Sequence, residues 1–549
     1  MGRLGRVPTR EDLERAARDL LGYETLLDGQ EEAIRSVLSG RDTLAVMPTG
    51  AGKSAVYQLC GALMTGGTVV VSPLIALQRD QQQSIAGMEA GEAAVLNSAL
   101  SERKRDDVLD DAEEGDVEFL LLAPEQLARP DVAESLSDLK LSLFVIDEAH
   151  CISEWGHDFR PEYLRLGDVI EQLGHPTVLA LTATAAPPVR DEIVERLRMN
   201  DPAVVVRGFD RPNIRLAVEA AGDPRAKRDR LVAAVVEAAK PGIVYTATRR
   251  GAEELAAELS AAGVDATAYH AGMPARVRER VQDEFMSDEG PSRVIVATTA
   301  FGMGIDKQDV RFVFHSEGSE SLDNYYQEMG RAGRDGEPSD AVLFYRAEDL
   351  SIRRFFAGRG RPDPDVLEKV LGVIRDAAAP IATAELSRRT GVSKARTERA
   401  SNLLAQAGAC RLSAGFVERV AGDERTPAAV ALEVIAADER RRRFNESRLE
   451  MMRAYAETRN CRRRFLLNYF GEAYEGTCGN CDNDEQAVPQ DDADEPRPFD
   501  LNSRVRHRTY GEGTVQDYEA DRMVILFDDA GYKTLDIEHT VSTGLIDSS

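Results

Sequence analysis

The sequence predicts an α/β protein with two successive lobes, each built around a parallel sheet, followed by three smaller domains. Short β-rich apolar runs alternate with helical stretches over residues 27–205, as in a parallel sheet that is buried on both faces. The pattern restarts at residue 242 and continues to residue 314. Beyond the second lobe it changes to helices separated by turns, then to a stretch with three cysteines, and finally to closely spaced short strands.

The composition indicates a globular protein of several domains. Of the 549 residues, 43% are hydrophobic and 30% are charged, and no apolar run approaches the roughly 20 residues that a membrane helix needs. Residues 1–19 are polar and arginine-rich, which does not fit a secretory signal. Six cysteines in a chain of this length do not make a disulfide framework, so we expect a reducing compartment, the cytoplasm.

The charge balance argues against a nucleic-acid partner at first sight. The chain has 68 basic and 95 acidic residues and a net charge of −27, whereas nucleic-acid binders usually carry a basic footprint. The excess is uneven, because residues 440–464 are strongly basic and residues 482–500 are strongly acidic. Binding depends on local potential, so a basic track remains compatible with the global charge.

The composition shifts predict six segments. They are a first lobe at 1–205, a second lobe at 206–357, a winged-helix-like domain at 362–428, a helical metal-binding hairpin at 436–485, an acidic linker at 486–499 and a small β-barrel at 500–549. Gly and Pro at 358–364 mark the end of the second lobe.

The winged-helix prediction depends on the order of elements after that linker. An apolar helical stripe at 366–374 precedes a second helical stretch at 383–390, a turn, a helix at 394–406 and a hairpin at 410–420. Helix, turn, helix and wing in this order are typical of a winged helix. An ordinary small helical domain is the alternative.

Residues 47–54 follow a predicted strand and precede a predicted helix, as a phosphate-binding loop requires. Backbone N–H groups around Thr49, Gly50 and Gly52 are expected to face the phosphates of ATP at a helix N-terminus. Lys53 is expected to reach the β- and γ-phosphates, and Ser54 is expected to ligate Mg²⁺.

Asp147 and Glu148 follow a run of four apolar residues, which predicts carboxylates at the end of a buried strand. Ligands of α/β sheets bind at that end. We expect Asp147 to hold Mg²⁺, directly or through water, and Glu148 to orient or deprotonate the attacking water. A solvated loop is the alternative.

Residues 327–336, beginning at Gln327, supply a third part of the site from the second lobe. Arg331 and Arg334 are three residues apart, so on a helical turn they would face the same way. An arginine that crosses the cleft to the γ-phosphate is worth roughly 10³–10⁵ in rate. Such a site couples ATP to closure of the cleft, which predicts a motor that moves a bound strand.

Tyr23 and Gln30 are candidates for holding the adenine of ATP. An aromatic ring can stack on the base, and an amide can bond its donor and acceptor edge. Ordinary packing is the alternative for both residues.

These stretches together resemble the RecQ helicases of superfamily 2. The matching segments are residues 22–30, 47–54, 147–150, 181–185, 300–307 and 327–336, and the resemblance covers 11–350 and resumes at 436–484. It implies two RecA-like lobes and 3′→5′ translocation on single-stranded DNA in repair or recombination. It also implies a nucleoid-associated protein. Leu27 departs from the family, which often has Arg there.

Residues 147–160 are the most specific stretch and look like the family's aromatic-rich loop, which couples DNA binding to ATP hydrolysis. Trp155 and Phe159 lie in a polar loop and suit base stacking, worth roughly 1–3 kcal/mol each. Arg160 is expected to contact nucleotide or phosphate. Core packing is the alternative for the tryptophan.

The resemblance also assigns DNA-related roles outside that loop. Thr182 and Thr184 would link the ATP site to the strand. His270 and Thr298 would contact the DNA backbone in the second lobe. Single-stranded and forked DNA are the expected substrates.

Cys461, Cys478 and Cys481 resemble three positions of the family's zinc module, which has four cysteines at Cys-x₁₆-Cys-x₂-Cys-x₂-Cys spacing. The fourth position is Asp484. A carboxylate oxygen is an allowed Zn²⁺ ligand, although it is uncommon in structural sites. Asp482, a water molecule or the absence of metal are the alternatives.

Two features depart from the family. The winged-helix-like segment falls between the motor and Cys461, whereas the family usually places it after the zinc module, so we assign no strand-splitting wing to residues 410–420. Residues 505–515 and 525–533 resemble the SH3/Tudor-like tail of UvrD-type helicases. Such tails bind proteins, RNA polymerase among them; a stabilising cap is the alternative. We expect a monomer.

Other functional hypotheses are compatible with part of these motifs. A DNA-stimulated translocase or annealing factor would hydrolyse ATP without unwinding, and the displaced winged helix motivates that reading. An RNA helicase of the same superfamily and a non-catalytic scaffold fit the sequence less well.

Overall fold

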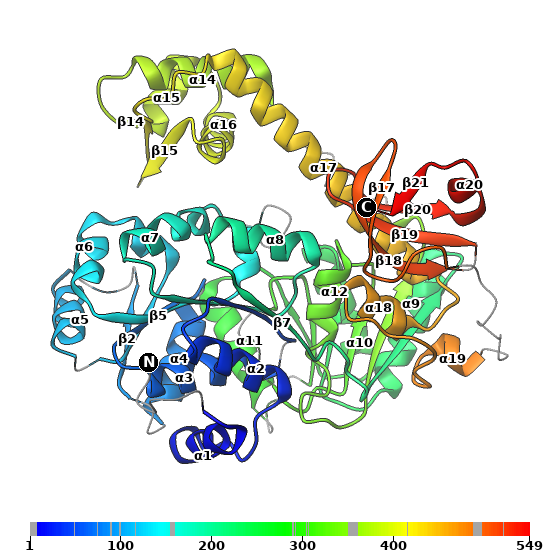
Figure 1. Cartoon of the computed structure of the whole chain (residues 1–549). Coiled ribbons are helices and arrows are strands. Elements are labelled where there is room, and N and C mark those ends of the chain that lie inside the picture. The colour runs from blue at the N-terminus through cyan, green and yellow to red at the C-terminus, as the bar shows by residue number, and fades with distance from the viewer. Residues whose placement is uncertain are drawn as a thin grey trace. The chain divides into compact units, whose positions relative to one another are not determined.

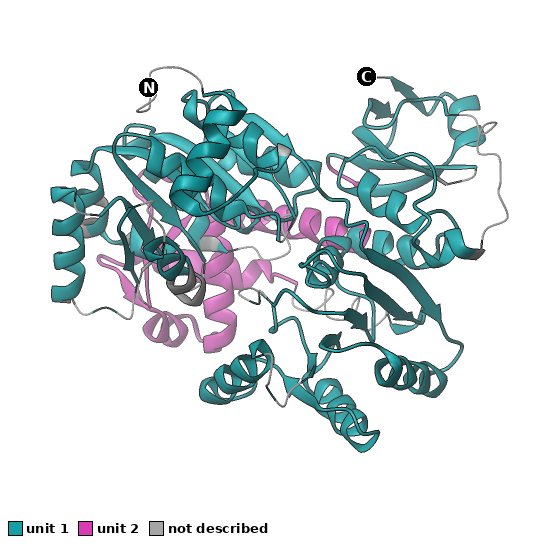
Figure 2. Cartoon of the chain, turned by 90° about the horizontal axis from the view of Figure 1, so that it is seen from below, with its two compact units in different colours: residues 1–351, 448–528, 532–549 teal, residues 352–447, 529–531 magenta. Residues whose placement is uncertain are grey.

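The computed structural model describes residues 8–548 except 49, 74, 88–90, 98–99, 101, 116, 154–159, 288–289, 291–292, 303–304, 306, 350–360, 414, 487–496 and 520. Its contacts divide the chain into two compact units. One contains residues 1–351, 448–528 and 532–549, and the other contains residues 352–447 and 529–531 (Figure 2).

The first lobe is built on a seven-stranded parallel sheet in the order β3-β4-β2-β5-β6-β1-β7. Strands β2, β5 and β7 of this sheet are labelled in Figure 1. Its strands are β1 (Thr43–Val46), β2 (Gly67–Val71), β3 (Ala93–Leu96), β4 (Phe119–Leu122), β5 (Leu141–Ile146), β6 (Thr177–Thr182) and β7 (Ala203–Val206). Its helices are α1 (Arg10–Leu21), α2 (Asp28–Leu38), α3 (Lys53–Leu63), α4 (Ile75–Ala86), α5 (Glu102–Glu114), α6 (Pro130–Asp138), α7 (Leu166–Gln172) and α8 (Pro187–Arg196).

The second lobe is built on a six-stranded parallel sheet in the order β10-β11-β9-β12-β13-β8. Its strands are β8 (Ile214–Ala220), β9 (Gly242–Tyr245), β10 (Ala266–Tyr269), β11 (Val294–Ala297), β12 (Phe312–His315) and β13 (Ser339–Tyr345). Its helices are α9 (Pro224–Glu237), α10 (Arg249–Ala261), α11 (Ala275–Met286) and α12 (Leu322–Met329). The two parallel-sheet lobes predicted from the sequence are therefore present.

Strand order explains why residues far apart in the sequence meet in the first lobe. Strand β6 lies between β5 and β1, and all three run in the same direction. The phosphate-binding loop after β1, the acidic pair after β5 and Thr182 at the end of β6 therefore reach the same edge of the sheet. Crossovers of parallel sheets place ligand sites at this edge.

The second unit contains a small domain with its own apolar core. Helices α14 (Pro364–Asp376), α15 (Thr383–Thr390) and α16 (Lys394–Gln406) accompany a three-stranded sheet in the order β14-β16-β15. Its strands are β14 (Ile381–Ala382), β15 (Cys410–Ser413) and β16 (Phe416–Arg419). The core also contains Val430 and Val434, which belong to the long helix α17 (Pro427–Glu457). The boundary predicted between residues 428 and 436 therefore falls inside one continuous helix.

The remaining elements follow α17 in the first unit. They are α18 (Arg462–Tyr469), α19 (Asp482–Gln486) and a five-stranded sheet in the order β20-β19-β18-β17-β21, with α20 (Ile537–Ser542) near its end. The strands are β17 (Arg504–His507), β18 (Gly511–Glu519), β19 (Arg522–Phe527), β20 (Gly531–Asp536) and β21 (Ile546–Ser548). Most of the predicted acidic linker lies outside the described residues. Within the described part, no helix has the length and apolarity needed to cross a membrane.

Candidate active site and metal centre

The loop between β1 and α3 has the backbone of a phosphate cradle. Gly50 and Gly52 have φ angles of 86° and 63°, a conformation that side chains disfavour. Lys53 begins α3, and its Nζ lies 3.2 Å from the carbonyl oxygen of Met47. Burial lowers the pKa of Lys53, while the negative charges of Glu148 and Asp147 oppose that shift. Thr49 lies outside the described residues.

Gln30 closes this loop from the side of α2. Its Nε2 donates to the carbonyl oxygens of Ala51 and Gly52 at 2.9 and 3.1 Å, and its Oε1 accepts from the backbone N–H of Leu27. Tyr23 lies before α2 and is 40% exposed. Both residues precede β1, and Gln30 contacts the loop that follows this strand. Their contact with adenine stays a prediction.

Asp147 and Glu148 extend from the end of β5, as the sequence predicted. Oδ1 of Asp147 accepts from the backbone N–H of Glu148 at 3.0 Å, and Oδ2 accepts from Nε2 of Gln81 at 2.9 Å. Burial, and then the neighbouring Glu148, raise the pKa of Asp147 to about 6, while Lys53 opposes them. Glu148 has a φ of 49°, a strained conformation that is typical of functional sites. Sequence reasoning missed Gln81, because it lies 66 residues from its partner.

The two threonines at and just after the end of β6 are buried. Thr182 and Thr184 are 0% and 1% exposed. The Nδ1 of His150 lies 2.9 Å from Oγ1 of Thr182 and 3.3 Å from a carboxylate oxygen of Glu148. Burial lowers the pKa of His150 to about 3, so this imidazole is neutral near pH 7. Thr182 thus connects to Glu148 through His150, and the backbone carbonyl of Thr184 accepts from Oγ1 of Thr182 at 3.1 Å.

The helical-turn premise for the two arginines is wrong. Helix α12 ends at Met329, and Arg331 and Arg334 lie in the turns that follow it. Arg331 is buried inside the second lobe, with Nη1 3.5 Å from the carbonyl oxygen of Ile305. Arg334 instead approaches the first lobe, since a Cβ added to Gly50 would lie 3.6 Å from its Cγ. The physical reason is that the glycines after Met329 end the helix, so a three-residue spacing no longer implies a common face. Gln327 is half-buried on α12.

The predicted DNA-contacting residues fall in several places. Trp155 and Phe159 lie outside the described residues. Arg160, just after them, donates from Nη1 to the carbonyl oxygen of Pro73 at 2.9 Å. His270 and Thr298 follow the adjacent parallel strands β10 and β11, and His270 is buried against Glu253 at 3.1 Å.

Four predicted metal ligands come together from the start of α18, the loop before α19 and α19 itself. The ligand atoms of Cys461, Cys478, Cys481 and Asp484 all lie within 4.8 Å of one another. A tetrahedral zinc ion with Zn–S bonds of about 2.3 Å needs neighbouring sulfurs about 3.8 Å apart, so the donor set fits zinc. One carboxylate oxygen of Asp484 accepts from the N–H groups of Cys478 and Gly479 at 2.7 and 2.9 Å, which orients the group.

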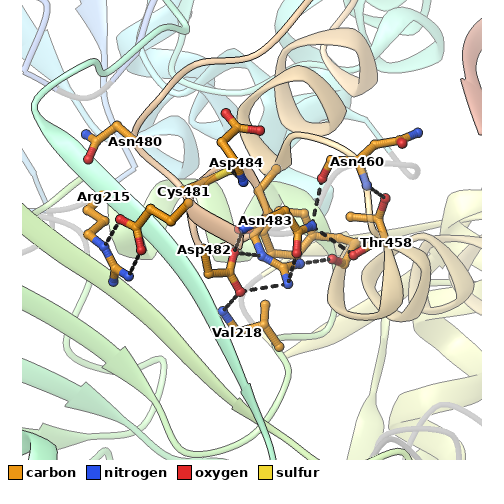
Figure 3. Close-up of polar contacts among 12 residues, drawn as sticks. Arg215, Val218, Thr458, Asn460, Asn480, Cys481, Asp482, Asn483 and Asp484 are labelled. Atoms are coloured by element: carbon orange, nitrogen blue, oxygen red, sulfur yellow. Dashed lines mark hydrogen bonds and ion pairs between the residues drawn. The ribbon is translucent and has the colours of Figure 1, made fainter. Parts of the chain in front are cut away.

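Asp482 is not a fourth ligand. Its two oxygens accept from Nε and Nη2 of Arg462 at 2.5 and 2.9 Å. One of them also accepts from the backbone N–H of Val218 at 3.0 Å (Figure 3). The alternative that places Asp482 on the metal is therefore wrong, because an ion pair and a strand N–H already hold this carboxylate.

The arginine run at the start of α18 is structural. Arg462, Arg463 and Arg464 are all buried. Each faces one carboxylate from another segment, and these are Asp482, Asp210 and Asp517 respectively. This part of the basic stretch is therefore not available as a track for nucleic acid.

Three family models match the chain. They are the DEAD/DEAH box helicase at residues 28–193, the helicase conserved C-terminal domain at 226–336 and the RecQ zinc-binding region at 423–485. With two parallel-sheet lobes and a phosphate-binding loop facing an arginine of the other lobe, they define an ATP-dependent helicase.

Relatives define the family. The chain is 36% identical over 511 residues to the "Probable ATP-dependent DNA helicase RecS" of Bacillus subtilis, covering 92% of this chain and 99% of that protein. It is 35% identical over 465 residues to the "ATP-dependent DNA helicase RecQ" of Haemophilus influenzae, covering 85% of this chain and 62% of that protein. The chain belongs to the RecQ family and is an ATP-dependent DNA helicase.

Solved structures agree on the fold. The crystal structure of the DUF1998 helicase MrfA bound to DNA and AMPPNP has a TM-score of 0.52 and 18% sequence identity, covering 77% of this chain and 63% of that chain. At this identity the likeness concerns only the arrangement of the chain.

Proposed function

We propose that the chain couples ATP hydrolysis to 3′→5′ translocation on single-stranded DNA and to duplex unwinding in DNA repair or recombination. The observation that carries the proposal is the position of Arg334 of the second lobe against Gly50 of the phosphate-binding loop. A site completed only when two lobes meet converts nucleotide state into relative movement of the lobes.

The site residues have separable roles in this proposal. The loop around Gly50 and Gly52, with Lys53 and Ser54, holds the phosphates. Asp147 holds Mg²⁺, which neutralises phosphate charge when bound. Glu148 positions the attacking water and accepts its proton. Arg334 contacts the γ-phosphate, and buried Arg331 supports the turn that carries it.

The DNA is proposed to cross both lobes. Trp155 and Phe159 stack on bases, and Arg160 fixes the end of their loop through Pro73. The chain Thr182–His150–Glu148 is the proposed route from this loop to the water-positioning carboxylate. His270 and Thr298, at adjacent strand ends, contact the DNA backbone.

The outer domains extend this motor. We assign the small domain of residues 362–428 as a winged helix, supported by its three helices and hairpin, and residues 500–549 as an SH3/Tudor-like barrel, supported by its five-stranded sheet. The barrel is proposed to bind a protein such as RNA polymerase. The Cys₃Asp site binds zinc, which cross-links the ends of the hairpin when bound. We expect a monomeric, cytoplasmic protein associated with the nucleoid.

One observation favours a second candidate function. The small domain precedes the zinc module in the chain, so the usual family order of the strand-splitting element does not apply. A DNA-stimulated translocase or annealing factor with little unwinding activity is therefore the alternative.

Strand displacement on forked and tailed DNA tests both candidates. We expect ATP-dependent unwinding of substrates with a 3′ single-stranded tail, with about one zinc per chain in the same sample. Lys53→Ala should abolish turnover, and Lys140→Ala is its matched control, because Lys140 precedes β5 and Asp147 follows the other end of this strand. DNA-stimulated hydrolysis without displacement would select the translocase, and stronger stimulation by RNA would reject both.

A further inference from the structure

The two lobes are joined by residues 207–213, between the end of β7 and the start of β8. We name this segment the interlobe linker. The metal module, residues 458–486, contacts it and the strand that follows it at several points. These contacts involve Phe209, Asp210, Pro212, Ile214, Leu216 and Val218.

Asn480 connects the metal ligands to the linker directly. Its Nδ2 donates to the carbonyl oxygen of Pro212 at 2.9 Å, and its own carbonyl accepts from the N–H of Leu216 at 3.3 Å. Its backbone N–H lies 3.4 Å from Sγ of Cys478. Asn480 lies between the proposed metal ligands Cys478 and Cys481, and it forms hydrogen bonds to both Cys478 and the linker. Figure 3 shows Asn480 beside Cys481.

Two further groups hold the linker near its two ends. Buried Arg463 donates to Asp210 at 2.9 Å and to the carbonyl oxygen of Ile214 at 2.7 Å. Glu472 accepts from the N–H of Phe209 at 2.9 Å, and the ring of Phe209 stacks on that of Phe470 with centroids 4.7 Å apart. The linker is thus fixed at both ends by the metal module.

Between Asp210 and Ile214, the linker forms hydrogen bonds to the turn that carries Arg334. The guanidinium of Arg211 donates to the carbonyl oxygens of Gly330, Ala332 and Gly333 at 3.1, 2.8 and 3.0 Å. Asn213 also donates to Gly333, at 2.8 Å. Three carbonyls held by one planar cation leave that turn little freedom to change direction.

We infer that the interlobe linker is a positioning device, in which the metal module fixes residues 209–214 and Arg211 orients the turn that places Arg334 at the phosphate-binding loop. Arg211 and Asn480 are therefore positioning residues for the ATPase reaction. The inference rests on the proposed role of Arg334, and it predicts that damage to Asn480 reaches the ATP site without loss of metal.

Two matched pairs of variants test this inference. Arg211→Ala is compared with Arg215→Ala, whose side chain pairs with Glu485 instead. Asn480→Ala is compared with Asn483→Ala, whose amide donates to Thr458 and Asn460 inside the metal module. Each full-length protein is assayed for DNA-stimulated ATPase kcat and KM, zinc content, and hydrogen exchange of residues 326–336.

We expect kcat to fall on the order of tenfold or more in Arg211→Ala and about two- to tenfold in Asn480→Ala, from the number of hydrogen bonds lost. KM for ATP and zinc content should stay near wild type, with faster exchange confined to the linker and residues 326–336. Arg211→Lys, which keeps a donor, should recover part of the rate, and it replaces Arg211→Ala if that variant does not fold.

Unchanged kcat in Arg211→Ala, or equal losses in Asn480→Ala and Asn483→Ala, would overturn the inference. Zinc loss or exchange spread over the whole chain in Asn480→Ala would overturn it as well. If Arg334→Ala retains wild-type kcat, the proposed function of that arginine fails instead. The exchange of residues 326–336 in Arg211→Ala then still decides whether the linker holds the turn.

Discussion

The ATP site and the metal module use charged side chains in opposite ways. At the ATP site, Lys53 contacts only backbone carbonyls in the hydrogen bonds described, and Asp147 accepts from one amide and one N–H. In the metal module, three successive buried arginines each face one carboxylate. Groups at the first site keep bonding capacity for a ligand, whereas groups at the second stabilise the fold.

This difference shows why a charge run alone does not identify a binding surface. Burying a charge is costly unless it is paired and hydrogen-bonded. Arg462–Asp482 is such a pair, with both oxygens of the carboxylate engaged. A reactive site needs charged groups that can still bind a ligand. The following variants compare the two kinds of charged group.

The largest effect is expected at the arginine that reaches across the lobes. Arg334→Ala should lower the kcat of DNA-stimulated ATP hydrolysis about 10³-fold or more, because the charge that develops on the γ-phosphate loses its partner. Nucleotide binding, measured with a fluorescent ATP analogue, should change little. Arg250→Ala, an exposed arginine of the same lobe, is the control. A residual rate above a tenth of wild type would contradict the assignment.

A buried ion pair of the metal module should matter for folding instead. Arg462→Met leaves Asp482 buried without its cation and should lower the free energy of unfolding by about 3–5 kcal/mol. The double variant Arg462→Met/Asp482→Leu should lose less, and the exposed Arg453→Ala about 1 kcal/mol or less. Urea unfolding of the zinc-loaded protein measures all three. The pairing argument would be wrong if the double variant were the least stable.

Asp484, the proposed fourth metal ligand, should have an intermediate effect. Asp484→Ala should weaken zinc at least about tenfold in a chelator competition, since losing even an outer-shell partner costs 10–100-fold. Asp484→Asn keeps an oxygen for the N–H groups of Cys478 and Gly479, so it measures the effect of the negative charge alone on zinc affinity. Asp484→Cys should restore or tighten binding. If Asp484→Ala bound zinc as tightly as wild type, Asp484 would not be a ligand and only the three cysteines would remain.

The smallest effect is expected at a glycine of the phosphate loop. Gly52→Ala adds a Cβ 2.6 Å from Nε2 of Gln30 at a φ of 63°, so ATP affinity should fall about tenfold, for a strain of about 1–2 kcal/mol. Gly40→Ala has a φ of 82° and no atom within 4 Å of the added Cβ. It should cost stability without affecting ATP affinity. Equal ATP affinities in the two variants would place the effect elsewhere.

Local patterns predicted much of this molecule. Helices at 383–390 and 394–406 have the predicted bounds, and strand β9 begins at residue 242, where the sequence analysis placed the restart of the apolar runs. The sequence placed Asp484 beside the three cysteines because ligand spacing is itself a local property, and its carboxylate lies within 4.8 Å of their sulfurs. Edge and late strands such as β8 and β21 were missed, since their apolar runs are short or interrupted by charge.

Long-range partners were not predictable in the same way. Gln81 and Arg211 bond groups 66 and about 120 residues away, and nothing in their neighbourhood marks them. Arg331 and Arg334 have the predicted spacing, but the first side chain is buried in the second lobe and the second approaches the first lobe. The reason is that the helix ends at Met329, before the first arginine. Tertiary contacts decide these positions.

If Asp484 binds the metal as proposed, it affects which ions compete for this centre. It carries the same formal charge as the thiolate it replaces, but its oxygen is a hard donor, whereas copper(I) and other thiophilic ions prefer sulfur. With one sulfur fewer, the shell discriminates less in favour of such ions and offers oxidants one target fewer. Copper stress and peroxide should therefore disturb this centre less than a four-thiolate centre.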